Sequence, residues 1–324
     1  MRIGVIGAGA WGTALAQVAA SGGEDVTLWA REPEVVASIN EAHVNALFLP
    51  KAKLSPAIRA TGDLADLAEA DALLVVVPAQ HVGAVLCEID VAGRPLVLCA
   101  KGIEAGTRRL VSEIAADVRP DAPLAVLSGP TFAHEVAAGL PTAVTLACAD
   151  PGLRNALAER LAGPSLRPYA SDDVIGAEIG GAVKNVLAIA CGVVDGAGLG
   201  QNARAAVIAR GFAEMTRYGI ARGARAETLS GLSGLGDLVL TCSSTSSRNF
   251  SLGVGIGEGR PAASMLADRR TVAEGAFTAP VLREDARARG VDMPVTEAVC
   301  ALLEGADVDA ITQALLARPL RPEA

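Results

Sequence analysis

Hydrophobic residues in the first half of the chain form short, uninterrupted runs that alternate with helical patterns. The runs are far shorter than the roughly 20 apolar residues of a membrane helix. They are typical of strands buried on both faces of a parallel sheet. The predicted strands are residues 1–6, 26–29, 73–77, 96–99, 124–127, 141–147 and 166–169, and the helices between them are residues 13–17, 34–40, 82–89, 132–138 and 153–161.

The pattern changes after Ser171, where strand signals stop and alanine-rich helical periodicity begins. Residues 178–189 predict one largely buried helix. Residues 201–222 predict a long amphipathic helix whose inward positions are Val207, Ile208, Phe212 and Met215. A chain of 324 residues is long for a single core. We therefore expect an α/β domain over residues 1–176 and an all-α domain over residues 177–324.

The first predicted strand leads into glycines spaced G-x-G-x-x-G, at Gly7, Gly9 and Gly12, and then into a predicted helix. In a dinucleotide-binding unit the first glycine allows the tight turn and the second lets backbone approach a pyrophosphate. The third allows helix and strand to pack closely. The pyrophosphate lies on the free N–H groups of the helix N-terminus. This context predicts that the α/β part is a Rossmann-type domain.

Three further positions follow the carboxyl ends of predicted strands, where open α/β sheets bind their ligands. Arg31 suits the 2′-phosphate of NADP and Glu32 a free ribose hydroxyl, although both also fit solvated loop charges. Lys101 fits either an ordinary loop lysine or a ligand contact. Residues 128–131 predict a tight turn beside the nucleotide, in which Thr131 is also placed to cap the next helix.

Composition limits the classes of binding partner, cysteine chemistry and metal site that the chain can have. The net charge is −8 and the pI is about 5.1, which argues against a nucleic-acid partner, so any anionic ligand needs a local basic cluster. The six cysteines form no CxxC pair and indicate reduced core residues of a cytosolic protein. Three histidines leave little material for a metal site, and we expect no metal and no membrane span.

Lys184 is the basic residue of the predicted helix 178–189 and has apolar neighbours. A buried lysine has a lowered pKa and can exchange protons near neutral pH, which makes Lys184 the candidate general acid/base. Gly180 and Gly181 share its face one turn earlier, at a cost of about 1 kcal/mol each against alanine. They leave room either for a ligand beside the ammonium group or for a closely packed helix.

Two segments of the second half add polar chemistry. Asp237 is a single carboxylate among glycines and aliphatic residues. It suits a helix N-cap or a hydrogen-bond partner for Lys184 or for a substrate hydroxyl. Ser247, Arg248 and Asn249 begin a predicted helix. Hydroxyl groups, free N–H groups and a guanidinium together can bind a phosphate, although a solvated, capped helix start has the same sequence.

Taken together, these segments resemble the bacterial NAD(P)-dependent sn-glycerol-3-phosphate dehydrogenase family, collinearly over nearly the whole chain. The matching segments are residues 7–15, 101–102, 128–133, 180–186, 234–242, 247–249 and 272–275. The resemblance implies a cytoplasmic enzyme, and a homodimer formed through the helical domain, that supplies glycerol 3-phosphate for phospholipid synthesis with NADP(H) or NAD(H) as coenzyme.

The resemblance also assigns residues by motif. Lys184 is the proton acceptor. The implied substrate contacts are Lys101, Gly129, Thr131, Lys184, Asp237, Ser247, Arg248 and Asn249. The implied coenzyme contacts, with the glycine turn, are Gly7, Gly9, Ala10, Trp11, Gly12, Arg31, Lys101, Ala133, Arg248, Val272 and Glu274.

The chain departs from the family pattern at Ala10, where a serine is usual, and at Ala276 and Phe277. The first change removes one side-chain hydrogen bond to the coenzyme. Two other functions remain open at this point. One is a dehydrogenase of the same layout that acts on a hydroxy acid or a keto-lactone precursor, and the other is a non-enzymatic NADPH sensor, which needs no buried lysine.

Overall fold

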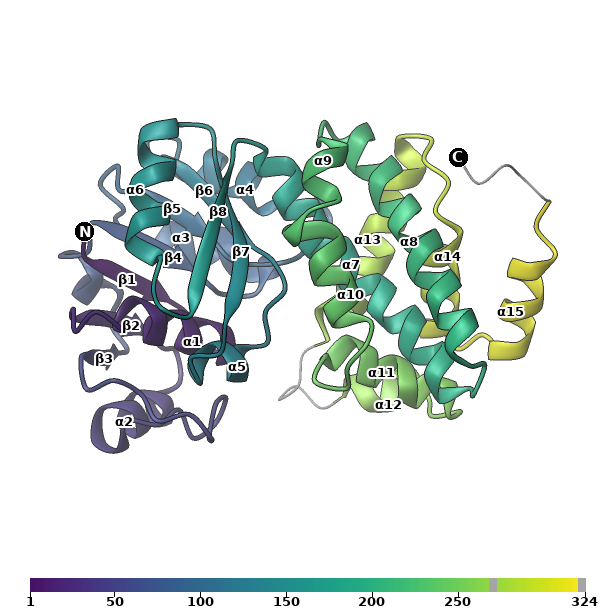
Figure 1. The fold of residues 1–324 in the computed structure, drawn as a ribbon, viewed down its shortest axis with the longest axis horizontal. Coiled ribbons are helices and arrows are strands. Elements are labelled where there is room, and N and C mark those ends of the chain that lie inside the picture. The colour runs from purple at the N-terminus through teal and green to yellow at the C-terminus, as the bar shows by residue number, and fades with distance from the viewer. Residues whose placement is uncertain (268–272, 320–324) are drawn as a thin grey trace.

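The computed structural model describes residues 1–267 and 273–319 and has two parts, a sheet domain and a helical domain (Figure 1). One eight-stranded sheet has the order β3-β2-β1-β4-β5-β6-β7-β8. All neighbouring pairs are parallel except β6 with β7. The strands are β1 (Ile3–Ile6), β2 (Val26–Trp29), β3 (Ile58–Thr61), β4 (Ala72–Val75), β5 (Leu96–Leu98), β6 (Leu124–Ser128), β7 (Thr142–Cys148) and β8 (Leu166–Ser171).

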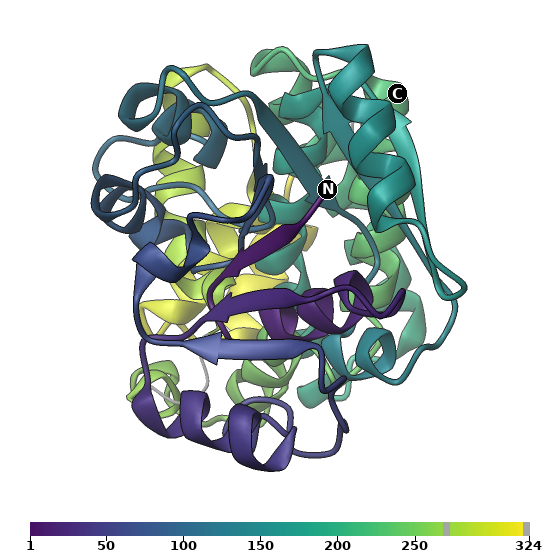
Figure 2. The same ribbon diagram turned by 90° about the vertical axis from the view of Figure 1, so that its left-hand side faces the viewer.

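Helices cover both faces of this sheet, because its central strands are apolar on both sides. One face packs against α1 (Ala10–Ala19), α2 (Pro33–Ala42), α5 (Ala133–Ala137) and α6 (Pro151–Leu161). The other face packs against α3 (Val82–Glu88) and α4 (Val111–Val118). Figure 2 shows the sheet in front of the helical domain, with α2 at its outer end. The Rossmann-type prediction is therefore confirmed.

The helical domain is built around α7 (Val174–Gly196), which is buried from Gly176 to Val194. Among the described residues it is the helix long and apolar enough to cross a bilayer, yet 89% of its apolar window is buried inside the protein. The surrounding helices are α8 (Gln201–Ala221), α9 (Ala226–Leu229), α10 (Asp237–Thr241), α11 (Arg248–Gly257), α12 (Ala262–Leu266), α13 (Glu274–Ala288), α14 (Pro294–Leu303) and α15 (Val308–Leu316).

The first turns of α7 join the two parts. Ala177 packs in the core of the sheet domain, whereas Ile179 belongs to the core of the helical domain. Glu178 lies between them and accepts hydrogen bonds from the backbone N–H and the hydroxyl group of Ser112 on α4. The predicted boundary at residue 176 therefore lies inside a continuous helix that contacts both domains.

The structure differs from the sequence analysis in three respects. Strand β3 was not predicted, because it is a four-residue strand at the sheet edge with Arg59 pointing to solvent. Helix α4 was also missed. Cys87 is exposed, while the other five cysteines are buried as expected.

Candidate functional site

A cavity of about 2220 Å³ lies at the carboxyl ends of β1, β4 and β5 and reaches the helical domain. Strand β1 is the point where the order of the strands reverses, which is the usual place for a nucleotide in this type of sheet. The cavity wall includes the glycine turn, the loops after β4 and β5, and parts of α7, α11 and α13. Its volume exceeds that of a single drug-sized pocket.

The glycine turn has the geometry of a dinucleotide site. Gly7 has φ +112°, which favours glycine. A Cβ atom on Gly12 would lie 1.8 Å from the carbonyl oxygen of Gly7, so the third glycine is required for packing. A Cβ atom on Gly9 would meet nothing within 4 Å, since that position faces the cavity. Gly9 is also the N-cap of α1. The residues therefore fit a coenzyme whose pyrophosphate lies against this helix N-terminus.

Arg31 lies at the cavity wall after β2. Its guanidinium forms a 3.2 Å ion pair with Glu32, and its side chain is 77% exposed. A side chain held this weakly can turn to an incoming anion.

Asp237 bridges two lysines from different domains. Nζ of Lys184 donates to Asp237 Oδ1 at 2.8 Å and to Thr241 Oγ1 at 2.8 Å. Nζ of Lys101 donates to Asp237 Oδ2 at 2.7 Å and to the carbonyl of Gly129 at 3.1 Å. Asp237 itself is 0% exposed. One buried carboxylate thus holds two ammonium groups at the cavity wall, where opposite charge offsets the cost of burial.

Burial lowers the pKa of Lys184 to about 8. Within this net value, Asp237 acts in the opposite direction to burial, and the charge of Lys101 adds to the lowering. A lysine with this pKa is present in both protonation states near neutral pH, as a general acid/base requires.

The paired glycines of α7 are explained by packing. A Cβ atom on Gly180 would lie 2.3 Å from the carbonyl oxygen of Ser233. A Cβ atom on Gly181 would lie 2.9 Å from the hydroxyl of Ser128 and 3.2 Å from Cγ of Lys101. Gly181 thus leaves room for the stem of Lys101, not for a ligand, and the close-packing interpretation of the two glycines is the correct one.

A second polar region lies at the N-terminus of α11. Ser247 is the N-cap and accepts from the backbone N–H of Phe250 at 3.2 Å. Arg248 is exposed and lines the cavity. The amide of Asn249 donates to Asn185 at 3.0 Å and accepts from the N–H of Gly275 at 2.9 Å. The capped helix start predicted here is confirmed.

Glu274 begins α13 on the same wall. Burial raises the pKa of its carboxyl group, and the charges of Arg248, Lys101 and Lys184 partly oppose that effect.

Most of the predicted site residues line one cavity. They are Gly7, Gly9, Ala10, Trp11, Gly12, Arg31, Lys101, Thr131, Ala133, Lys184, Ser247, Arg248, Asn249 and Glu274. Two predicted substrate contacts do not line it. Gly129 presents its carbonyl to Lys101 and to Thr131, and Asp237 lies behind the two lysines. Val272 lies outside the described residues.

Thr131 does not cap α5, because its hydroxyl donates to the carbonyl of Gly129 at 3.2 Å and Phe132 occupies the N-cap position. Asp237 is not an N-cap either, since Gly236 precedes α10 in that position. Among the cavity residues that were not predicted are two polar ones beside Lys184 and Asn249, namely Thr241 and Asn185. The spacing of Thr241 was a usable signal, because it lies one helical turn after Asp237 and therefore on the same face.

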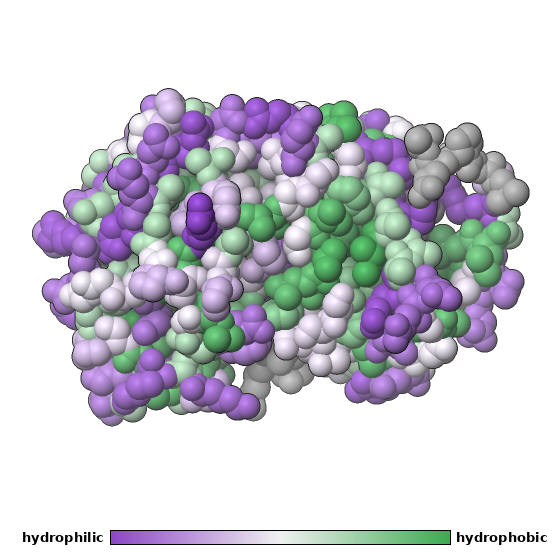
Figure 3. Space-filling view, viewed as in Figure 1, coloured by the Kyte–Doolittle hydropathy of each residue, from purple (hydrophilic) through white to green (hydrophobic). Residues whose placement is uncertain are grey.

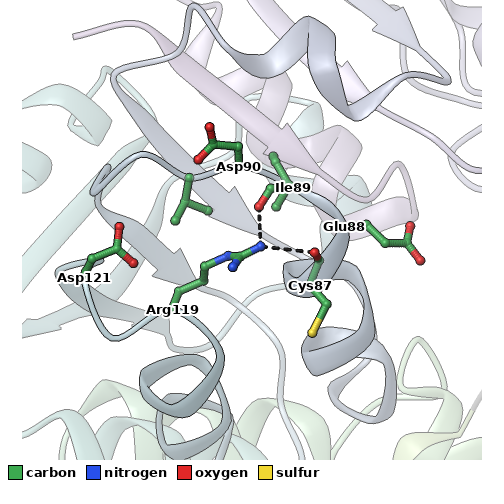
Figure 4. A pocket seen from close by; sticks show the side chains of 7 residues that line it. Cys87, Glu88, Ile89, Asp90, Arg119 and Asp121 are labelled. Carbon is green, nitrogen blue, oxygen red and sulfur yellow. Dashed lines mark hydrogen bonds between the residues drawn. The ribbon is translucent and has the colours of Figure 1, made fainter.

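A smaller hollow of about 360 Å³ lies between the ends of α3 and α4. Figure 4 shows the guanidinium of Arg119 pointing toward the backbone carbonyls of Cys87 and Ile89. These bonds join the end of α4 to the end of α3. Within residues 1–267 and 273–319, no group of three or more His, Cys, Asp or Glu side chains could hold a metal ion.

The chain matches two family models that together cover most of its length. Residues 2–154 match the N-terminal part of NAD-dependent glycerol-3-phosphate dehydrogenase, and residues 173–313 match its C-terminal part. A glycerol-3-phosphate dehydrogenase (NAD(P)+) of Erythrobacter litoralis is 65% identical over 99% of this chain and 98% of its own length. The Caulobacter vibrioides protein of the same name is 59% identical over 100% of this chain and 99% of its own.

Solved structures agree. A glycerol-3-phosphate dehydrogenase from Coxiella burnetii superposes with a TM-score of 0.93 at 40% identity, over 98% of this chain and 99% of that chain. A ketopantoate reductase from Ralstonia eutropha, with a TM-score of 0.61 at 16% identity over 98% of this chain and 100% of that chain, shares the fold alone. On these matches, the chain belongs to the NAD-dependent glycerol-3-phosphate dehydrogenase family.

Proposed function

We propose that the protein catalyses the reversible oxidation of sn-glycerol 3-phosphate to dihydroxyacetone phosphate with NAD(P)+. The observation that carries this proposal is a buried lysine, Lys184, with a pKa near 8, in the wall of a cavity that the glycine turn and Arg248 also line. The nicotinamide of the bound coenzyme accepts or supplies the hydride.

Lys184 is assigned to proton transfer. In oxidation the neutral amine takes the proton of the substrate hydroxyl group, and in reduction the ammonium group polarises the carbonyl and then gives the proton back. Asp237 and Thr241 hold the nitrogen in place by hydrogen bonds of 2.8 Å each. We assign Asp237 to positioning the two lysines, because it lies behind them and does not line the cavity.

The substrate phosphate is assigned to the N-terminus of α11, where Ser247, Arg248 and Asn249 line the cavity. Lys101, Thr131, Ser247 and Asn249 line the same cavity and are the remaining candidate contacts. Binding energy from the phosphate can orient the reacting carbon.

The coenzyme is assigned to the glycine turn, with Ala10, Trp11, Ala133 and Glu274 as further wall residues. Arg31 is the candidate partner of a 2′-phosphate. An Arg31→Ala variant should lose preference for NADP over NAD in steady-state kinetics, and an unchanged ratio would make the arginine a plain loop charge. Val272 keeps its assignment as a coenzyme contact by resemblance alone.

A single assay tests the function. Purified protein mixed with NADPH and dihydroxyacetone phosphate should consume NADPH, as absorbance at the nicotinamide band reports. Binding of NADPH without turnover would instead indicate the sensor, and turnover only with a hydroxy or keto acid would indicate the other dehydrogenase. The buried lysine argues against the sensor, because binding alone does not need it.

We also propose a cytoplasmic enzyme that supplies glycerol 3-phosphate for phospholipid synthesis and acts as a homodimer. Hydrophobic surface gathers over α8 and α10 (Figure 3), where Val239 is 47% exposed, and such patches often mark protein interfaces. Light scattering of the purified protein measures the mass, and a monomer would contradict the dimer.

A further inference from the structure

A buried polar triangle lies directly behind the glycine turn. The side-chain amide of Asn45 donates to the carbonyl of Ala8 and to the hydroxyl of Thr13, both at 2.8 Å. The hydroxyl of Thr13 donates to the same carbonyl at 3.3 Å. Asn45 and Thr13 are both 0% exposed, and Ala8 is 4% exposed. Three groups from the turn, from α1 and from the segment after α2 are thus joined away from water.

The carbonyl of Ala8 and the N–H of Gly9 belong to one planar trans peptide, so they point in opposite directions. Asn45 and Thr13 hold the carbonyl on the buried side of the turn. The N–H of Gly9 is therefore turned away from the buried side. Gly9 lines the cavity, and a Cβ atom there would meet nothing within 4 Å, so the space on the open side of the turn is free for a ligand.

Asn45 also holds a wall of the same cavity. Its Oδ1 accepts from the N–H of Phe48 at 3.0 Å, and its backbone carbonyl accepts from the N–H of Leu49 at 2.9 Å. Residues 47–53 line the cavity. At the far end of this segment, the N–H of Ser55 donates to Gln17 of α1 at 2.8 Å. Both ends of the wall are therefore fixed to the helix that begins at the glycine turn.

We propose that Asn45 is a positioning residue for the coenzyme, which sets the direction of the Gly9 N–H and fixes the wall of residues 47–53 against the turn. The inference rests on the proposed function, because it takes the ligand of this cavity to be a dinucleotide. Asparagine suits the position because its amide donates to two acceptors while its oxygen accepts an N–H. A preorganised turn binds its ligand without the cost of ordering.

Asn45→Asp is the sharpest probe. An aspartate has the same shape and keeps the acceptor for Phe48, but it cannot donate to the carbonyl of Ala8 and places a second acceptor beside it. Equilibrium titration with NADPH, followed by the fluorescence of the nicotinamide, should show a dissociation constant raised roughly tenfold or more. The kcat at saturating NADPH and the KM for dihydroxyacetone phosphate should stay within about twofold of wild type.

Asn40→Ala is the matched control, because Asn40 makes two hydrogen bonds to the backbone of Ala60 and does not line the cavity. Its NADPH affinity should equal that of the wild type. If Asn45→Asp does not fold, Thr13→Val removes both hydrogen bonds of the Thr13 hydroxyl at nearly constant volume. It keeps the bond from Asn45 to the carbonyl of Ala8 and should therefore weaken NADPH binding by a smaller factor.

Three outcomes decide the matter. Wild-type protein that binds NADPH, with unchanged affinity in the folded Asn45→Asp or Thr13→Val variant, overturns the inference alone. A loss of kcat or a raised KM for dihydroxyacetone phosphate, at unchanged NADPH affinity, also overturns it. Wild-type protein that binds neither NADPH nor NADH overturns the proposed function, and the inference with it.

Discussion

The two ends of the cavity differ in which part of the chain forms the binding site. At the glycine turn the backbone provides the geometry, and at the opposite end charged side chains from both domains meet on Asp237. The turn occupies six consecutive residues, whereas Lys101 and Asp237 are 136 positions apart in the sequence. A backbone site depends on which side chains are absent, and a side-chain site depends on how distant segments pack.

Removal of Lys184 should show most clearly that the two ends of the cavity contribute to different properties, turnover and coenzyme binding. Lys184→Ala deletes the proposed acid/base, so kcat should fall roughly 100- to 10,000-fold. The glycine turn is untouched, so the variant should bind NADPH as the wild type does. Steady-state assays and NADPH titration measure the two effects. Retained turnover would refute the acid/base assignment.

The glycine turn can be broken in two distinguishable ways. Gly12→Ala places a methyl group 1.8 Å from the carbonyl of Gly7, so it should lower the stability of the sheet domain by about 1–3 kcal/mol or more. Gly9→Ala meets no protein atom within 4 Å, and its φ of −63° suits alanine. That variant should keep its melting temperature yet lose NADPH affinity, because the methyl group occupies coenzyme space. Equal melting temperatures for the two variants would contradict this distinction.

This contrast also explains what could be predicted from the sequence. The glycine turn could be predicted because its three glycines lie close together in the sequence. Lys184 could be predicted because a lysine in an apolar helix is rare. The bridging role of Asp237 between two lysines was only partly readable. Its contact with Lys184 was one of several alternatives, and its contact with Lys101 depends on how α10 packs against the loop after β5. The function of Gly181 was ambiguous for the same reason, since its neighbour Lys101 comes from the other domain.

A variant of Arg248 tests the side-chain end of the cavity without changing the proton-transfer residue Lys184. Arg248→Ala removes a charged hydrogen-bond donor from the proposed phosphate site, so the KM for dihydroxyacetone phosphate should rise roughly 10- to 100-fold. Because the family resemblance also assigns Arg248 to the coenzyme, NADPH affinity should be measured in parallel. An unchanged KM would exclude it from phosphate binding.

The pH dependence should differ in sign between the two reaction directions. Burial lowers the pKa of Lys184 to about 8. The oxidation needs the neutral amine, so its kcat should rise with pH until about 8 and then level off. The reduction needs the ammonium group, so its kcat should fall above that pH. Parallel profiles in both directions would assign the titration to another group.

The smallest expected effect lies where the two domains meet. Burial raises the pKa of Glu178 to about 7 from 4.5, so the folded protein holds its proton more tightly than the unfolded chain. The stability contributed by that proton is complete below pH 4.5 and is lost as the pH rises through 7. Glu178→Gln should therefore gain about 2 kcal/mol relative to wild type between pH 5 and pH 8.

The glutamine fits because the hydroxyl of Ser112 can reverse its hydrogen bond and accept from the new amide. Glu214 provides the matched comparison, since burial raises its pKa to about 7 as well. Its carboxylate accepts from the backbone N–H groups of Val295 and Thr296, which cannot reverse. Glu214→Gln should therefore lose stability, and denaturant unfolding across this pH range measures both variants. Kinetics of Glu178→Gln should match wild type, because the link between the domains is kept, and a changed kcat would show that this carboxylate acts on the lysines.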